Sequence, residues 1–408
     1  MDKKKIKVEN LFMASMAAYY FAQIFLAYSN NGWFGELGSD YLAFWSSGHI
    51  ANTQGYIFIY DLNVQEIIQR LYLPTEVIGV SPIAYFPIFM APFQVMTLMP
   101  PSISFLIWTV ISLMVFFFYT KERLLAHLPI RYLWLCMLAV PFFLNAFFGQ
   151  VEVWLMIFTS EFLIAWEQGK SFKSGLWLGL MLLKPQILIL IIPYLILNRY
   201  WRILGGFIAA SSFILLSSFL LIGTDGLIQL TNLWLGFATG LPSNSPEVMM
   251  NWRMLGLHVS NLISPEAGPI VILLGSIITL GFCLPFFLNR AKRDDSLPLI
   301  SIFGIFAATL AITWHSHQHM ALVLIPFFFK LLQQDIIPVR LFKAWVFIPV
   351  IVYWAAYLIV ALMVFNILPM VTAFGGLATS TCMLLFNLFF LYDARKLNQK
   401  TVMFAQVN

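Results

Sequence analysis

The sequence predicts an all-α integral membrane protein that crosses the bilayer many times. Of its 408 residues, 61% are hydrophobic and only 10% are charged, whereas an ordinary globular chain carries roughly 25% charged residues. Short basic clusters separate the apolar runs, which is typical of cytoplasmic loops and not of a nucleic-acid-binding surface. Judged by the length that a helix needs to span a bilayer, we expect a single domain over residues 1–408 with about 11–12 transmembrane segments.

The first apolar run covers residues 11–28 and follows the basic start MDKKKIK. Such a start is similar to that of a signal peptide, and Ala27-Tyr28-Ser29 faintly resembles a cleavage site. The run is nevertheless long for the apolar part of a signal peptide and long enough to cross a bilayer. We interpret it as an uncleaved first span with the N-terminus in the cytoplasm.

The remaining apolar runs predict the other spans, and two stretches among them are irregular. Three prolines lie within residues 81–93, so the stretch 83–99 makes a poor straight span and is expected to lie in or dip into the membrane interface. Lys184-Pro185 interrupts the run 174–198, which is either one crossing or two half-spans broken at the proline. The regular spans are expected at residues 102–119, 131–148, 150–167, 203–222, 268–288, 297–313, 317–333, 345–363 and 373–392.

The distribution of basic residues favours one layout of these segments. All but three of the 23 Lys and Arg residues share a side if 83–99 does not cross and 174–198 is a broken pair. Short cytoplasmic loops are rich in Lys and Arg, so this side is cytoplasmic and holds both termini of a multi-pass plasma-membrane protein. Residues 30–101, with interfacial helices, and residues 223–267 then form long outer loops. We expect recognition or chemistry on this outer face.

The first candidate functional residue is Asp40, which follows the first span. Gly38 and Ser39 allow a turn, and either Ser39 or Asp40 can cap the helix that follows. A carboxylate at a membrane surface beside aromatic rings is costly to desolvate, which indicates a functional residue. The alternative is an N-cap on a surface helix. One face of an amphipathic interfacial helix is predicted to carry Tyr41, Phe44, Trp45, Gly48 and His49.

Further polar residues interrupt the apolar runs near the expected outer face. Gln150 and Glu152 begin a span, where polar side chains either face a ligand or are satisfied by water. Glu161 is expected to pair with a neighbouring span. Lys184 lies within an apolar run, so it must lose its charge or have an anionic partner, which is Glu152, Glu161 or a ligand phosphate.

Two outer loops add cationic and imidazole side chains. Asn251 and Arg253 lie in one loop, and a planar guanidinium donates two hydrogen bonds at once, which suits phosphate. Anchoring at the interface is the alternative role for this arginine. The other loop reads WHSHQH and holds His315, His317 and His319. A metal site needs about three ligands with supporting hydrogen bonds, and no further cluster completes one, so we expect contacts to phosphate or sugar and no metal.

Seven motifs follow one another along the chain: SDYLAFWSSGHI from Ser39, GYIFIYD from Gly55, YFP from Tyr85, FGQV from Phe148, LKP from Leu183, NWRML from Asn251 and the loop at His315. In this order they resemble the motifs of glycosyltransferase family 87, the bacterial polyprenol-phosphate-dependent mannosyltransferases of the GT-C fold. The resemblance covers most of the chain from the first span to the histidine loop. Many relatives have Asn where this chain has Glu152, and Met320 stands where the family's acid often follows the histidine.

The resemblance implies transfer of a hexose, mannose, from a polyprenyl-phosphate donor to a lipid- or glycan-linked acceptor on the outer face of the bilayer, with inversion. Asp40 would be the base that takes the proton of the acceptor hydroxyl. No cofactor is expected, because lipid carries the donor. The leaving phosphate and the substrates would be bound by Arg253, Lys184, His315, Asn251, Gln150, Glu152, Trp45 and His49. The alternatives are a transporter or flippase of lipid-linked sugars and an enzyme like O-antigen ligase or polymerase.

Overall fold

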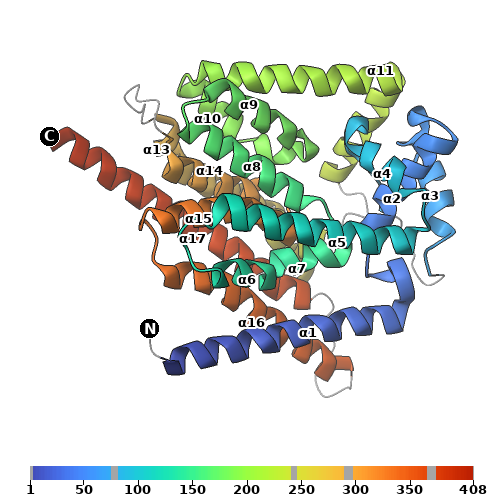
Figure 1. The fold of residues 1–408 in the computed structure, drawn as a ribbon, viewed down its shortest axis with the longest axis horizontal. Helices are drawn as coiled ribbons and strands as arrows, with labels where there is room; N and C mark the ends of the chain where they lie inside the picture. Colours follow the sequence, from blue (N-terminus) through green and yellow to red (C-terminus); the bar gives the residue numbers. More distant parts are fainter. Residues whose placement is uncertain (1–2, 75–80, 240–245, 289–296, 365–373, 408) are drawn as a thin grey trace. The chain divides into compact units, whose positions relative to one another are not determined.

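The computed structural model describes residues 3–74, 81–239, 246–288, 297–364 and 374–407 (Figure 1). These residues are nearly all helical, and they form no strand beyond one isolated bridge between Met249 and His317. Six of the helices are long and apolar enough to cross a membrane. The predicted class, an all-helical protein that crosses the membrane several times, is confirmed.

The chain folds into two compact units, which two long helices join. Unit 1 holds residues 1–153 and 213–244, and unit 2 holds residues 154–212 and 245–408. The joining helices are α8 (Glu152–Glu167) and α11 (Trp201–Thr239), which is broken at Gly223. Unit 1 contains α1 (Lys3–Gly35), α2 (Ser39–Thr53), η1 (Tyr56–Phe58), α3 (Leu62–Arg70), η2 (Pro87–Met90), α4 (Ala91–Met96), α5 (Pro101–Tyr119), η3 (Thr120–Leu124), α6 (Arg131–Leu138) and α7 (Val140–Phe148). Unit 2 contains α9 (Ser171–Leu180), η4 (Met181–Leu183), η5 (Pro185–Leu188), α10 (Ile191–Leu197), η7 (Pro246–Val248), α12 (Trp252–Leu262), α13 (Ala267–Leu288), α14 (Leu299–Ile312), η8 (Gln318–Leu324), α15 (Ile325–Gln333), α16 (Val339–Val364) and α17 (Phe374–Val407).

The expected membrane segments appear as helices of two lengths. The six long candidates are Val8–Thr53, Pro101–Leu124, Trp201–Phe237, Ala267–Leu288, Val339–Ile359 and Leu377–Gln399. Helices α6 and α7 make one more candidate, bent by 58°, where Ala139 is extended and Pro141 begins the next helix. The shorter apolar helices are Pro87–Met96, Ser171–Leu183, Pro185–Leu197, Leu299–Ile312 and Gln318–Gln333. The predicted total of about 11–12 crossings requires some of these shorter helices to cross the membrane, and this stays a prediction.

The two irregular stretches have the form that the prolines indicate. Residues 83–99 contain only η2 and the short α4, so no long helix forms there. The run 174–198 is interrupted at Lys184, because Pro185 removes a backbone donor and starts the next helical turn. The structure therefore has the broken form of this run, with α9 before Lys184 and α10 after it.

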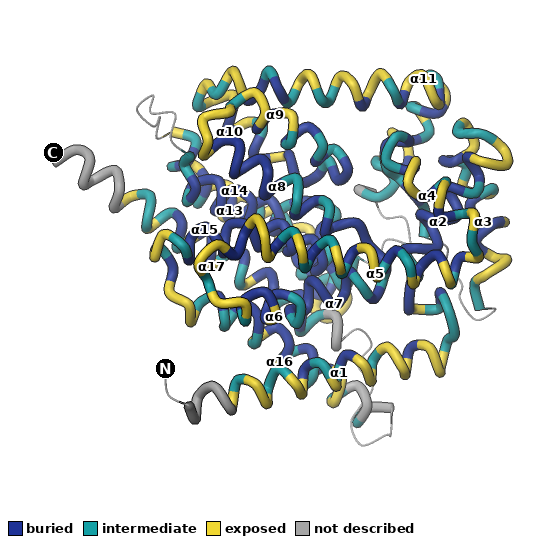
Figure 2. Tube along the Cα trace, in the orientation of Figure 1, coloured by how far each residue is buried: buried dark blue, intermediate teal, exposed yellow. Residues whose placement is uncertain are grey.

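Burial differs sharply among the helices of unit 2 (Figure 2). Helix α14 is buried over nearly its whole length, and its Phe303 and Phe306 contact Phe327 of α15. Helix α13 instead exposes apolar side chains such as Leu273 and Ile277. An exposed apolar surface on a helix of membrane length is typical of contact with lipid.

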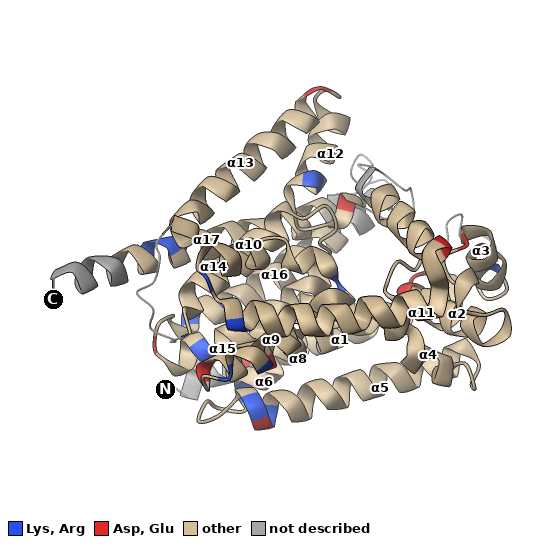
Figure 3. Ribbon diagram, turned by 90° about the horizontal axis from the view of Figure 1, so that it is seen from above, with Lys and Arg blue, Asp and Glu red and all other residues tan. Residues whose placement is uncertain are grey.

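Charged residues are sparse along the helices and lie mainly at their ends and in loops (Figure 3). This placement fits a membrane protein, since a charge inside the bilayer costs several kcal/mol, on the order of 2.5–3.5 at a helix centre. The basic cluster at residues 290–293 and residues 242–245 of the predicted second outer loop lie outside the described residues.

Candidate active site

Asp40 lies in the first turn of α2, but it does not cap that helix. The N-cap is Gly38, whose left-handed φ of 77° suits glycine, and no side chain makes a capping hydrogen bond there. The predicted capping role of Ser39 or Asp40 is therefore wrong. The Asp40 carboxylate instead accepts a 2.6 Å hydrogen bond at Oδ2 from Gln150 Nε2. The structure thus joins two of the predicted site residues within unit 1.

Helix α2 is buried on most of its surface inside unit 1, whereas the sequence predicted an amphipathic interfacial helix with one apolar face. Tyr41, Phe44 and Trp45 are all buried. Phe44 stacks on Phe93 of α4 with ring centroids 4.8 Å apart. Gly48 allows this approach, because a Cβ there would lie 2.6 Å from the Phe93 backbone. The aromatic residues that predicted a membrane-facing stripe form protein core, since periodicity reports a buried face without saying what buries it.

Gln150 is positioned by the turn between α7 and α8. Gly149 ends α7 with a left-handed φ of 73°, and a Cβ at this position would lie 2.6 Å from Tyr41 Cβ. The backbone N–H of Gln150 donates to Asn145 O at 2.8 Å. Its carbonyl accepts a longer, 3.4 Å hydrogen bond from Trp108 Nε1. Only glycine fits both the backbone conformation and the close approach that bring Gln150 to Asp40.

Glu152 begins α8 and is completely buried. Its backbone N–H donates to Asn145 Oδ1 at 3.0 Å, so Asn145 holds this turn through both its carbonyl and its side chain. Asn145 and Trp108 were not identified from the sequence. Each residue carries a polar side-chain atom within an apolar run, but nothing in the spacing of the two residues relates them to Gln150.

Trp45 and His49 form a stacked pair one helical turn apart on α2. Their rings lie 5.1 Å apart and nearly parallel, and the ring of Tyr72 meets Trp45 edge-on. The indole N–H of Trp45 donates to Met99 O at 3.1 Å. The buried Trp45 thus orients the partly exposed His49.

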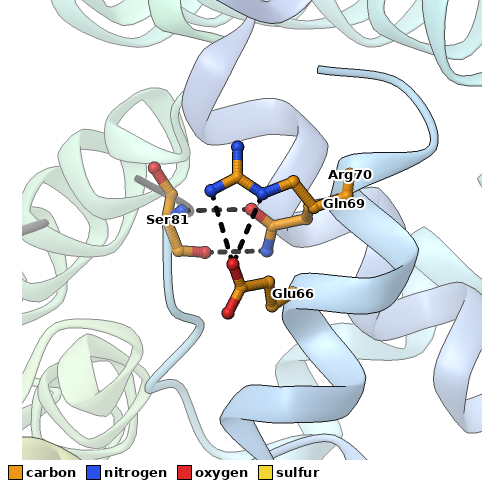
Figure 4. Close-up of polar contacts among 4 residues, drawn as sticks. All are labelled: Glu66, Gln69, Arg70 and Ser81. Atoms are coloured by element: carbon orange, nitrogen blue, oxygen red, sulfur yellow. Dashed lines mark hydrogen bonds and ion pairs between the residues drawn. The ribbon is translucent and has the colours of Figure 1, made fainter. Parts of the chain in front are cut away.

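Residues 81–86 form no regular secondary structure and contact α2 through the ring of Tyr85; this segment is called the strap below. Its first residue is fixed by Gln69 of α3, whose Nε2 donates to Ser81 O at 2.9 Å and whose Oε1 accepts from Ser81 N–H at 3.0 Å (Figure 4). The neighbouring Glu66 and Arg70 pair with each other at 3.3 Å on the exposed side of the helix (Figure 4). A side-chain amide here replaces the partner that a neighbouring strand would supply.

Three more side chains hold the strap. Gln65 lies one turn before Gln69 and is likewise buried. The strap places Tyr85 with its ring 5.1 Å from that of Phe44, which lies one turn after Asp40 on α2. The other strap bonds are Ile83 N–H to Gln65 Oε1 (2.9 Å), Trp234 Nε1 to Ala84 O (2.7 Å) and Tyr60 hydroxyl to Tyr85 O (2.5 Å).

In unit 2, Lys184 lies at the break between η4 and η5 and is buried. Gln186 follows on η5, and its Nε2 lies at the 3.5 Å limit of a hydrogen bond to His315 O. The broken run and the histidine loop thus meet within this unit.

Asn251 is the N-cap of α12, as its Oδ1 accepts from Met254 N–H at 2.9 Å. Its Nδ2 donates to Thr313 O at 2.7 Å, so both ends of this buried amide bind the protein backbone. Arg253 follows in the first turn of α12, and its Nη1 donates to Trp314 O at 3.0 Å. Burial lowers the pKa of Arg253, which Glu247 opposes, and an arginine side chain remains cationic in proteins.

The histidine loop is irregular, with one bridge between His317 and Met249. The ring of His317 lies 4.8 Å from that of His315 and 5.5 Å from that of His319. Burial holds the pKa of His315 well below 6.5, and the neighbouring histidines, Lys184 and Arg253 lower it further. His315 is therefore neutral at pH 7. Within the described part of the chain, no group of three or more His, Cys, Asp or Glu is arranged to hold a metal ion.

Comparison with known proteins gives one result. The family model of glycosyltransferase family 87 matches residues 84–313, more than half of the chain. The comparisons with curated proteins and with solved structures give no match. The matched range includes Gln150, Glu152, Lys184, Asn251 and Arg253. His315 lies two residues after this range, whereas Asp40 lies 44 residues before it.

Proposed function

Because the chain belongs to glycosyltransferase family 87, we propose that it transfers a hexose, mannose, from a polyprenyl-phosphate donor to a lipid- or glycan-linked acceptor. The family fixes glycosyl transfer as the reaction class. We assign the fold to the GT-C type, with the chemistry on the outer face of the plasma membrane. In this proposal the transfer inverts the anomeric centre, Asp40 is the base, and Arg253, Lys184 and His315 bind phosphate.

The hydrogen bond between Gln150 and Asp40 carries the assignment of the base. General bases must be held at a defined orientation towards the proton that they remove. The Gln150 amide fixes one oxygen of the Asp40 carboxylate without neutralising it, since an amide is only a hydrogen-bond donor here. Asp40 also does not cap α2, so helix capping does not explain why an acidic residue stands at the start of this helix. These two observations favour a chemical role over a purely structural one.

The leaving group supports the assignment of the cations in unit 2. A polyprenyl phosphate leaves as an anion, so it needs positive charge and hydrogen-bond donors more than a general acid. Arg253 and Lys184 supply the charge, and the neutral His315 supplies an N–H donor without further charge. Asn251 positions Arg253 through the cap of α12. Trp45, His49 and Glu152 remain the proposed substrate contacts of unit 1.

The family match weighs against the rival functions. A transporter or flippase of lipid-linked sugars would use buried charges as a pathway, and an O-antigen ligase or polymerase would use similar histidine and arginine chemistry. Neither function requires an oriented carboxylate directly after the first membrane helix. Glycosyl transfer by a single base accounts for Asp40 and for the family together.

We expect Asp40→Asn to lower transfer from polyprenyl-phosphate mannose by at least about 100-fold, the lower end of what a general base contributes, while the protein still folds. The purified enzyme in detergent would be assayed with mannosyl and glucosyl donors. Asp61→Asn is the matched control, because this acid of unit 1 caps α3 through Asn63 N–H and Val64 N–H. Retention of more than a tenth of the wild-type rate in Asp40→Asn would exclude the base role. A preference for the glucosyl donor would exclude mannose.

A further inference from the structure

We propose that Ser380 of α17 is a positioning residue, which fixes the two loops that carry Arg253 and His315 in one register. This inference rests on the proposed function, in which these two side chains bind the donor phosphate. Ser380 lies beyond residues 84–313, the range that the family model matches. It is completely buried.

The Ser380 hydroxyl links the two loops through a continuous chain of hydrogen bonds. Gln318 Nε2, at the start of η8, donates to Ser380 Oγ at 2.8 Å. Ser380 Oγ donates in turn to Val248 O at the end of η7, also at 2.8 Å. A hydroxyl has one donor and can accept as well, so this arrangement uses both capacities. Gln318 follows His315 by three residues, and Val248 precedes Arg253 by five.

The same two loops are joined directly by backbone contacts. Met249 bridges His317, and Met250 N–H donates to Ser316 O at 2.8 Å. A single short bridge of this kind is weak alone, since isolated pairs of extended segments are marginal in water. The Ser380 hydroxyl adds a third point, from a long helix that belongs to neither loop. Register errors in the bridge would displace Arg253 and His315 relative to each other.

Ser380 does not touch the reacting groups in this proposal, so its removal should affect positioning more than chemistry. Ser380→Ala should make the amides of residues 246–254 and 313–318 exchange hydrogen roughly three- to tenfold faster, the range for loss of one buried hydrogen bond. It should also raise the apparent KM for the polyprenyl-phosphate donor while leaving the acceptor KM unchanged.

Thr379→Val is the matched control on the same helix. Thr379 is equally buried, and its hydroxyl makes no hydrogen bond with any described residue. Hydrogen exchange in the two loops should therefore stay at wild-type rates in Thr379→Val. Equal exchange in Ser380→Ala and Thr379→Val would overturn the proposal.

Gln318→Met removes the other side-chain hydrogen bond of the relay that runs from Gln318 through Ser380 to Val248. It provides the test if Ser380→Ala fails to fold. If the two residues act as one relay, the double variant should be no worse than the worse single variant, because coupled residues are not additive. Additive losses would show that the relay does not exist. The exchange measurement needs no substrate, so it judges the relay even if the wild-type protein fails to transfer mannose, a result that would refute the proposed function instead.

Discussion

At the scale of single residues, the orientation of Asp40 depends on side chains that the sequence relates to it only in part. Asp40 was predicted as a site residue because a carboxylate beside aromatic rings at a membrane surface is costly to desolvate, and Gln150 because it begins a span near the expected outer face. Asn145 and Trp108 were not, although they fix the turn that carries Gln150. Their role is to bond backbone groups, and backbone groups leave no trace in a residue pattern.

Gly149→Ala should be among the most destabilising substitutions in unit 1. It adds the cost of a left-handed backbone, about 1–2 kcal/mol, to an overlap with Tyr41 Cβ at 2.6 Å, and overpacking costs about 1–3 kcal/mol. Thermal unfolding in detergent would measure the change. Gly169→Ala is the control, since φ is +70° there and nothing lies within 4 Å of the added Cβ. Equal losses in the two variants would mean that the contact with Tyr41 yields easily.

His315 should make the protein less stable as the pH falls below about 6.5, the usual pKa of histidine. The folded pKa lies well below 6.5, so between the two values the unfolded chain binds a proton that the folded chain does not, and acid favours unfolding. The contribution of His315 to the free energy of unfolding is therefore fully present above pH 6.5 and decreases as the pH falls from 6.5 towards the pKa of His315 in the folded protein. Unfolding midpoints at pH 7.5 and 5.0 should differ less in His315→Gln than in the wild type. His127→Gln, at an exposed histidine, controls for loss of an imidazole, and an unchanged difference in His315→Gln would contradict the assignment.

At the scale of elements, hydrophobic run length predicted most helices, and the prolines predicted where runs break. The helix expected at 102–119 is α5, and Lys184-Pro185 divides the next ambiguous run. It was harder to predict which side chains of each helix face the protein interior. Helix α3 turns its glutamines inward, with Gln69 1% exposed, and its Ile67 outward at 64%. This orientation follows from the strap, because the strap backbone needs the Gln65 and Gln69 amides as hydrogen-bond partners. The helical periodicity of the sequence alone does not distinguish it from the usual orientation, in which the apolar side chains face inward.

Gln69→Leu should destabilise unit 1 by about 2–4 kcal/mol, because it leaves the N–H and C=O of Ser81 without their partner and an unmade buried hydrogen bond costs about 1–3 kcal/mol. Glu66→Ala on the same helix should change stability by less than about 0.5 kcal/mol, since it removes only an exposed i,i+4 pair. Chemical denaturation in detergent would compare the two. A loss in Glu66→Ala that matches the loss in Gln69→Leu would show that the strap contributes little to stability.

At the scale of the whole molecule, the charge distribution predicts sidedness, which each unit's internal packing leaves open. The layout depends on two conditions, and both stretches have the predicted form: 83–99 contains only short helices, and 174–198 is broken at Lys184. The division into two units could not be inferred from the sequence, because α8 and α11 pass from one unit to the other without a polar linker. Composition indicates linkers, and a continuous apolar helix conceals such a boundary.

Single cysteines should report this topology in cells. The background would lack the native Cys136, Cys283 and Cys382. Cysteines replacing Asn63 and Asn261, both exposed, should react with an impermeant thiol reagent from outside intact cells, because they lie in the predicted outer loops. Cysteines replacing Gln168 and Gln399, also exposed, should react only after permeabilisation. Labelling of Gln168→Cys in intact cells would place the 150–167 segment the other way round and would overturn the layout.

The strap also determines where sequence change can accumulate. Besides the Tyr85 carbonyl, its hydrogen bonds use main-chain atoms of Ser81, Ile83 and Ala84, and every non-proline residue possesses such atoms. Selection can therefore act weakly on these three side chains. It can act strongly on the side chains elsewhere in the sequence that bond the strap backbone. A drifting lineage would keep Gln65 and Gln69 while the side chains of Ser81, Ile83 and Ala84 changed. The conformation of the strap thus depends on its neighbours, and the substitutions that alter it most would occur on α3, which holds none of the proposed substrate contacts.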